Sequence, residues 1–191
     1  MPYIMGVVGS ARRKGNTDLL VSRVLEGAAV AGADTEKVLL GGLEIRACEG
    51  CHRCWRGKPC RHRDDMRRLY RMTANADALV FGTPVYWYGP TALMKAFLDR
   101  FVYFNCPGNR PQVQGKAAAL VVPFEEEDPA AAELLVALFE RSLAYLEMRL
   151  VGTLLVPGVS AKGDVLQKAE RLAEAEALGR GLVEELHHAG G

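Results

Sequence analysis

Four cysteines lie close together between residues 48 and 60, where their thiolates could bind a metal ion or an iron–sulfur cluster. Their spacing is Cys48-x2-Cys51-x2-Cys54-x5-Cys60. Four thiolates on one compact loop can surround a [4Fe–4S] cluster, because each iron corner needs one ligand that points inward. The fourth cysteine comes later than in bacterial ferredoxins, where it follows after three residues. A reducing compartment keeps thiols available as ligands or redox groups, so a tight intracellular cluster favours metal or redox chemistry over structural disulfides.

The same cysteines are compatible with other chemistry. Structural zinc usually binds two separated pairs of ligands, so this spacing favours zinc less, although His52 and His62 could complete a zinc site. We interpret both histidines as ordinary surface residues. The overlapping Cys-x-x-Cys units could also form a redox-active dithiol. Cys106 is remote in the sequence, and we interpret it as an incidental thiol.

Positive charge is concentrated around the cysteines. From Arg46 to Arg71 there are nine Arg or Lys residues against three acidic ones. This excess could offset the negative charge of a thiolate-bound cluster, dock an acidic electron-transfer protein or attract nicotinamide phosphates. A solvated basic face remains the alternative.

A second candidate site is the loop Gly9-Ser10-Ala11-Arg12-Arg13-Lys14-Gly15-Asn16-Thr17. Backbone amides and a helix dipole at a strand-to-helix loop bind anions such as phosphate. Ser10, Asn16 and Thr17 can add hydrogen bonds, and Arg12 adds charge. The loop matches neither GxGxxG nor the Walker sequence, which disfavours a Rossmann dinucleotide site or an NTPase. A solvated basic turn is the alternative.

A third candidate is the aromatic loop from Gly82 to Pro90, which contains Tyr86-Trp87-Tyr88. Three consecutive aromatic residues between Pro and Gly-Pro cannot all be buried in one core. Planar side chains beside backbone amides suit a flat tricyclic ring such as a flavin. An oligomer interface is the alternative, and both can hold together.

The elements that must position these residues alternate between short strands and longer helices. Five strands joined by helices predict a doubly wound α/β fold, in which a parallel sheet is covered on both faces. Ligands of such a fold bind at the carboxyl ends of the strands. Asn16 or Thr17 is the expected N-cap of the first helix. We expect strands at 4–8, 35–40, 78–82, 117–122 and 151–156, and helices at 17–31, 64–75, 90–104, 130–148 and 164–188.

Length and composition are those of a globular protein with one domain. The chain has 191 residues, is 49% hydrophobic and carries a formal net charge of +1. We therefore expect one domain over residues 1–191, with a cysteine-rich insertion at about 45–63. The charge gives no reason to expect nucleic acid as a partner. We see no apolar run of the roughly 20 residues that span a membrane and no basic leader, so a cytoplasmic location is expected.

Two of these loops resemble the signatures of the NADPH-dependent FMN reductase superfamily. The first resembles GS-x-R-x-x-GNT, and the aromatic loop with the residues up to Arg100 resembles GTPVYW…PxxxKxFxDR. The resemblance covers essentially the whole chain and implies a flavodoxin-like five-stranded sheet. It also implies that Ser10, Arg12, Asn16 and Thr17 hold the FMN phosphate. The flavin ring would be lined by Pro84, Val85, Tyr86 and Trp87.

The cysteine pattern is similar to that of the iron–sulfur flavoproteins, a branch of the same superfamily. These proteins carry a [4Fe–4S] cluster beside FMN and form dimers or tetramers. Other relatives share the cysteines before the Asp64-Asp65-Met66 sequence, and not all of them hold a cluster. The resemblance also implies a homodimer or homotetramer. The helices offer apolar faces at Leu93, Phe97, Phe101, Leu134, Leu138 and Leu146, and packing within a monomer would use the same residues.

These observations lead to three hypotheses. We expect an FMN-dependent electron-transfer flavoprotein, an oxidoreductase with a [4Fe–4S] cluster on the four cysteines, that relays electrons between a ferredoxin-like carrier and a small-molecule acceptor. The alternative is an NAD(P)H-dependent FMN or quinone reductase without a cluster. A zinc-stabilised flavodoxin-like binding module is the third. The cofactors carry the redox chemistry, so we assign no catalytic acid or base.

Overall fold

A computed structural model describes residues 1–189 and contains a five-stranded parallel sheet in the order β2-β1-β3-β4-β5. This is the strand order of flavodoxin-like doubly wound proteins, so the expected fold class is confirmed. The polar strand β2 lies at an edge, whereas β3 and β4 are buried along their whole length. The strands are β1 (Tyr3–Val8), β2 (Asp34–Leu39), β3 (Ala78–Gly82), β4 (Ala117–Pro123) and β5 (Arg149–Val156).

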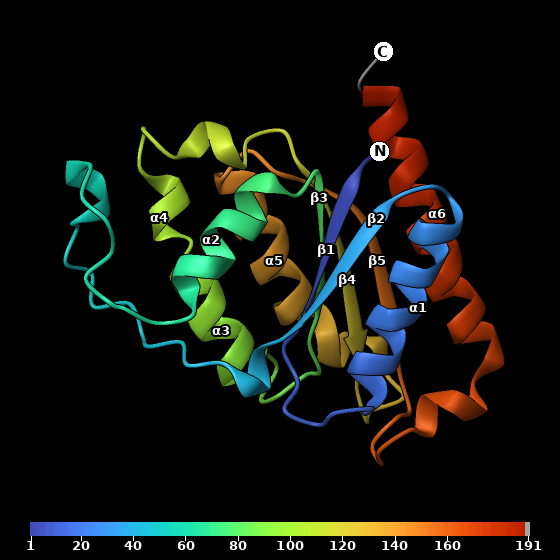
Figure 1. The fold of residues 1–191 in the computed structure, drawn as a ribbon. Coiled ribbons are helices and arrows are strands. Elements are labelled where there is room, and N and C mark those ends of the chain that lie inside the picture. The colour runs from blue at the N-terminus through green and yellow to red at the C-terminus, as the bar shows by residue number, and fades with distance from the viewer. Residues whose placement is uncertain (190–191) are drawn as a thin grey trace.

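Helices cover both faces of the sheet (Figure 1). One face carries α1 and α6, which pack around residues such as Leu20 and Leu182. The other carries α2, α3, α4 and α5, where Phe97 and Phe139 belong to the larger buried cluster. The helices are α1 (Asn16–Val30), α2 (Met66–Asn75), α3 (Ala92–Asp99), α4 (Val102–Asn105), α5 (Glu133–Tyr145) and α6 (Ala169–Ala189).

Four expectations about helices are corrected. The helix expected over 164–188 begins with a 3-10 turn at Asp164–Gln167, and α6 starts at Ala169. The helix expected over 90–104 is split into α3 and α4, and the buried side chain of Arg100 lies at the break between them. The helix expected from residue 130 begins with a 3-10 turn at Pro129–Ala132. The N-cap of α1 is Gly15 rather than Asn16 or Thr17.

The placement of the loops follows from the parallel sheet. The segments after β1, β3, β4 and β5 all leave the same edge, so residues far apart in the sequence meet there. The cysteine-rich segment extends to the side of the molecule, beyond α2 and α4 (Figure 1). Within residues 1–189, no helix combines the length and apolar character needed to cross a membrane.

Candidate functional site

A hollow lies at the carboxyl edge of the sheet, where four loops meet. It contains seven of the eight residues that the two motifs predict for FMN, from Ser10 in the first loop to Tyr86 in the aromatic loop. Trp87 does not line it. The lining residues are Ser10, Arg12, Asn16, Thr17, Pro84, Val85, Tyr86, Pro123, Phe124, Glu125, Val159 and Ser160.

The first loop leaves backbone donors free for an anion. Gly15 is the N-cap of α1 and, lacking a side chain, supplies no hydrogen bond to the helix amides. A Cβ at Gly15 would lie 2.9 Å from the carbonyl oxygen of Arg12, so the tight turn requires glycine. Amides at an uncapped helix N-terminus favour a negatively charged ligand. This part of the hollow therefore fits a phosphate group.

Two polar side chains of this loop, Arg12 and Asn16, already have partners within residues 1–189. The guanidinium of Arg12 donates through Nη1 to the carbonyl oxygen of Ser160 at 2.9 Å. Asn16 donates to the carbonyl of Ala161 at 2.9 Å and accepts from the amides of Gly163 and Val165. Asn16 thus ties the loop after β5 to the hollow, which is a role beyond the phosphate contact expected for it.

The aromatic loop is a tight two-residue hairpin. The amide of Tyr86 donates to the carbonyl of Gly89 at 2.8 Å, and the amide of Gly89 donates back at 3.0 Å. Trp87 and Tyr88 have φ angles of 50° and 60°, in the left-handed region. Such turns normally use Gly or Asn, so two aromatic residues there indicate strain of the kind found at functional sites. Trp87 is 97% exposed.

Two threonines hold the aromatic loop against the first loop. The hydroxyl of Thr91 donates to the carbonyl of Gly9, and its amide donates to the hydroxyl of Thr83 at 3.2 Å. Thr91 also caps α3 by accepting from the amide of Met94. The two candidate loops are therefore one connected unit, although they come from different parts of the sequence.

Sequence reasoning missed the residues that β4 and β5 contribute. Pro123 is the last residue of β4 and Phe124 follows it, while Val159 and Ser160 come from the loop after β5; all four line the hollow. Their position just beyond the carboxyl ends of strands was the available signal. Glu125, in the acidic segment after β4, adds a carboxylate to the rim of the hollow.

The four cysteines line a second hollow together with Tyr70, Arg100 and Tyr103. Each cysteine is free and half-buried. Four thiols are a suitable donor set for an iron–sulfur cluster. Within residues 1–189, however, no three His, Cys, Asp or Glu side chains are gathered closely enough to hold a metal ion. The donor chemistry thus fits a cluster, while the sulfurs are not in a ligating arrangement.

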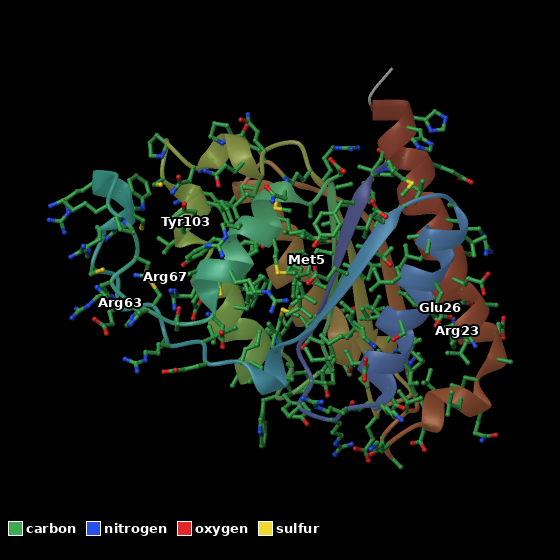
Figure 2. All side chains as sticks on the ribbon, in the orientation of Figure 1. Met5, Arg23, Glu26, Arg63, Arg67 and Tyr103 are labelled. Atoms are coloured by element: carbon green, nitrogen blue, oxygen red, sulfur yellow. The ribbon has the colours of Figure 1, made fainter. Side chains whose placement is uncertain are left out.

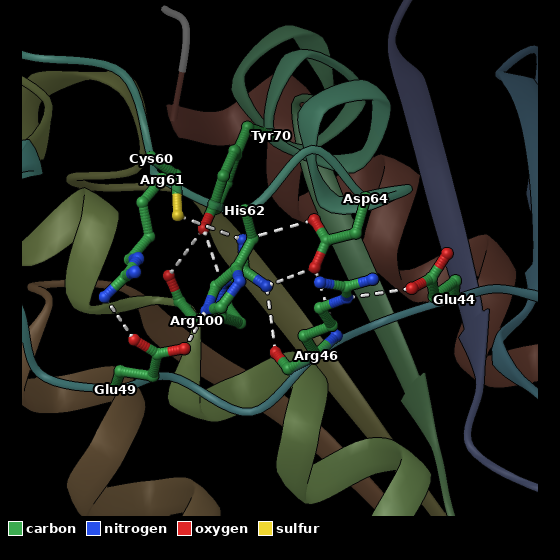
Figure 3. Close-up of polar contacts among 9 residues, drawn as sticks. All are labelled: Glu44, Arg46, Glu49, Cys60, Arg61, His62, Asp64, Tyr70 and Arg100. Atoms are coloured by element: carbon green, nitrogen blue, oxygen red, sulfur yellow. Dashed lines mark hydrogen bonds and ion pairs between the residues drawn. The ribbon is translucent and has the colours of Figure 1, made fainter.

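A buried ion pair closes the base of the cysteine loop (Figure 3). The guanidinium of Arg100 is 1% exposed and donates to Asp64 Oδ2 at 2.6 Å. It also donates to the carbonyl of Arg46 at 2.9 Å and to Cys60 Sγ at 3.3 Å. Its Nε donates to the hydroxyl of Tyr70 at 3.2 Å. The geometry satisfies both charges, which burial otherwise makes costly.

The ion pair determines the charge state of both partners. Burial alone would raise the pKa of the Asp64 carboxyl, but hydrogen bonds from Arg100 and from the amide of Arg46 outweigh it, and the pKa lies below its usual value. Burial is the largest single effect and opposes the charge on Arg100, but the hydrogen bond to Asp64 together with the interactions with Tyr70 and Cys60 outweighs it and raises the pKa of Arg100. From the sequence, Arg100 is recognised only as the last residue of a family signature, and no role is predicted for it.

Two sequence interpretations near the cysteines change. His62 is 8% exposed, so the expectation that it is a surface residue is wrong. Its Nε2 lies 3.5 Å from Glu49 Oε1. Among the described residues, this nitrogen has no hydrogen-bond partner. Cys106 is buried and lines a third hollow together with Cys54, so this fifth thiol adjoins the cysteine loop. Burial raises the pKa of Cys54.

The basic residues around the cysteines face outward. Arg63 and Arg67 are exposed and lie on the side of the molecule that carries the cysteine loop (Figure 2). Arg46, Arg61 and Arg63 line a shallow hollow beside His62. Arg46 pairs with Glu44 at 2.8 Å and Arg61 pairs with Glu49 at 2.6 Å, whereas Arg63 forms no ion pair with another described residue.

Comparison with known proteins identifies relatives of two kinds. The model of the family described as NADPH-dependent FMN reductase matches residues 2–158. An iron–sulfur flavoprotein from Archaeoglobus fulgidus is 34% identical over 120 residues, which cover 63% of this chain and 53% of that protein. A putative NAD(P)H-dependent FMN-containing oxidoreductase from Bacillus subtilis is 27% identical over 175 residues, covering 89% of this chain and 92% of that protein.

The chain spans about half the length of the iron–sulfur flavoproteins that it matches. Among solved structures, a Trp repressor binding protein from Bacillus subtilis is similar, with a TM-score of 0.70 and 24% identity over 92% of this chain and 98% of that chain. At this identity, the likeness supports the fold alone.

Proposed function

Because the chain belongs to the NADPH-dependent FMN reductase family, we propose that it is an oxidoreductase whose FMN binds in the hollow at the carboxyl edge of the sheet. The observation that carries this proposal is the convergence of two loops, about seventy residues apart, on one hollow. Ser10, Arg12 and Thr17 come from the first loop, and Pro84 to Tyr86 come from the second.

In this proposal, each loop has a separate task. The amides at the N-terminus of α1 and the charge of Arg12 bind the phosphate. Pro84, Val85 and Tyr86 offer a surface for the flavin ring, with Phe124 supplying a further apolar contact and Trp87 lying at the exposed tip of the hairpin. Bound FMN would accept a hydride from NAD(P)H and pass electrons to a small-molecule acceptor.

The cysteine loop is the second part of the proposal. Cys48, Cys51, Cys54 and Cys60 would hold a [4Fe–4S] cluster and provide a one-electron port for a ferredoxin-like carrier. Four free thiols in one hollow, a basic surface around them and the names of several relatives support this. The ungathered sulfurs favour the alternative, an NAD(P)H-dependent FMN or quinone reductase without a cluster.

We also propose one domain over residues 1–191, a cytoplasmic location and self-association as a homodimer or homotetramer. Exposed apolar side chains on the hairpin and on α5 would be protected by a second copy; they include Trp87, Tyr88, Leu134 and Tyr145. Light scattering of the purified protein tests self-association, and a monomer at micromolar concentration would contradict it.

One preparation separates these functions. The protein is purified without oxygen, and its flavin, iron and sulfide are measured before titration with NADH and NADPH. We expect bound FMN whether or not the cysteines hold a cluster. If they do, we expect about four iron and four sulfide atoms per chain. FMN that NAD(P)H reduces in protein without iron, even after reconstitution, would establish the alternative. Protein that neither retains nor binds FMN would contradict the proposal.

A further inference from the structure

A carboxylate lies next to the loop that would bind the phosphate. Asp18, in the first turn of α1, is only 6% exposed. Its Oδ2 accepts the backbone amide of Lys14 at 2.7 Å. Lys14 has a φ of 55°, a left-handed conformation that costs energy for a residue with a side chain. Asp18 therefore helps to hold the turn that shapes the loop.

This carboxylate creates an electrostatic conflict. A negative charge in the first turn stabilises a helix, but a phosphate bound at the same helix end would be repelled by it. Because Asp18 is nearly buried, solvent screens the repulsion less than it would at an exposed position. A site for a phosphate dianion thus needs a cation that compensates Asp18.

Lys37 provides that cation from a different element. Its Nζ lies 2.5 Å from Asp18 Oδ1 and donates to the hydroxyl of Ser22 at 2.6 Å. The lysine is on the edge strand β2, and its side chain is 30% exposed. Lys37 does not line the hollow, so any effect on the ligand must act through Asp18 and through its charge.

We propose that Lys37 is a positioning residue that makes the hollow selective for phosphorylated flavin. It neutralises Asp18, so that Asp18 can order the turn at Lys14 without repelling the phosphate. The inference rests on the proposed FMN site. It predicts that the pair affects the affinity for FMN and leaves the affinity for riboflavin, which has no phosphate, unchanged.

The test compares FMN with riboflavin on the same flavin-free protein. Dissociation constants are measured by quenching of flavin fluorescence for the wild type and for Lys37→Met, Asp18→Asn and the double variant. Lys37→Met is expected to raise the dissociation constant of FMN by about tenfold and to change that of riboflavin by less than about twofold. The asparagine of Asp18→Asn still offers a side-chain oxygen that accepts the amide of Lys14. The double variant is therefore expected to bind FMN as tightly as the wild type.

A matched control removes a cation from α1, the helix that carries Asp18. Arg23 is exposed on α1 and pairs with Glu26 (Figure 2), so Arg23→Met is expected to leave both affinities unchanged. Equal losses of FMN and riboflavin in Lys37→Met, or no loss of either, would overturn the inference and leave the pair as a link between β2 and α1. A wild type that binds neither flavin would overturn the FMN site itself.

Discussion

At the scale of single residues, Arg100 links the cysteine loop to the rest of the protein. It follows α3 and reaches Asp64, Arg46 and Cys60, which all belong to the cysteine loop or its boundaries. The pair is buried on both sides, so each charge depends on the other. A buried charge that loses its partner is far more costly than an exposed one.

We predict that Arg100→Met lowers the free energy of unfolding by about 3–5 kcal/mol, because it leaves the Asp64 carboxylate buried without its cation. Urea unfolding followed by circular dichroism measures this change. The matched control is Arg63→Met, which removes an exposed arginine beside the same loop and should cost less than about 0.5 kcal/mol. Equal effects of the two substitutions would contradict the role assigned to Arg100.

Tyr3 gives a prediction about alkaline pH. Partial burial, followed by its hydrogen bond to Glu36 at 3.0 Å, raises the pKa of Tyr3 from 10.0 to about 12. Between these values the unfolded chain loses the phenol proton while the folded chain keeps it. The contribution of Tyr3 to stability is therefore complete below pH 10 and is lost as the pH rises toward 12.

The corresponding experiment compares the wild type with Tyr3→Phe. Urea unfolding at pH 9 and pH 11 should show a smaller loss of stability in the variant, because phenylalanine has no proton to lose. Thiols and lysines titrate in both proteins and cancel in the comparison. An identical loss in the two proteins would show that Tyr3 ionises alike in the folded and unfolded chains.

At the scale of elements, the close approach of α1 and α6 depends on two glycines. A Cβ at Gly27 would overlap the backbone carbonyl of Glu176, and a Cβ at Gly179 would overlap that of Val24. Backbone atoms cannot move aside as a flexible side chain can. The helices must therefore separate if either glycine is replaced, which would loosen α1 and the loop at its N-terminus.

We predict that Gly179→Ala lowers the free energy of unfolding by about 1–3 kcal/mol through overpacking. Gly181→Ala is the control on the same helix, since a Cβ there meets no atom within 4 Å. Alanine also favours a helix over glycine by roughly 1 kcal/mol, so the control should be neutral or stabilising. Thermal unfolding in which both variants behave alike would contradict this account of the packing.

At the scale of the whole molecule, the sequence predicted the architecture well. Alternation of strands and helices gave the doubly wound fold, and the two motifs gave seven residues of the hollow. Both depend on regularities that persist along the chain: apolar periodicity, and the rule that parallel strands end at one edge. The family is confirmed by the match over residues 2–158.

What the sequence could not predict depends on contacts between distant segments. His62 is buried, and at the break between α3 and α4 Arg100 pairs with Asp64, which lies 36 residues earlier in the chain. Trp87 lies outside the hollow, in a left-handed turn of the hairpin where propensity predicts Gly or Asn. Val159 and Ser160 enter the hollow only through the register of β5 beside β4.

The central claim, an FMN site in the hollow, is tested most directly by comparing two neighbouring arginines. Both side chains are exposed, but Arg12 lines the hollow and Arg13 does not. We predict that Arg12→Met weakens FMN binding by about ten- to a hundredfold, as expected for a lost charge-assisted hydrogen bond, while Arg13→Met changes it by less than about threefold. Fluorescence titration of flavin-free protein gives both values. Equal effects of the two substitutions, or no binding of FMN by the wild type, would contradict the claim.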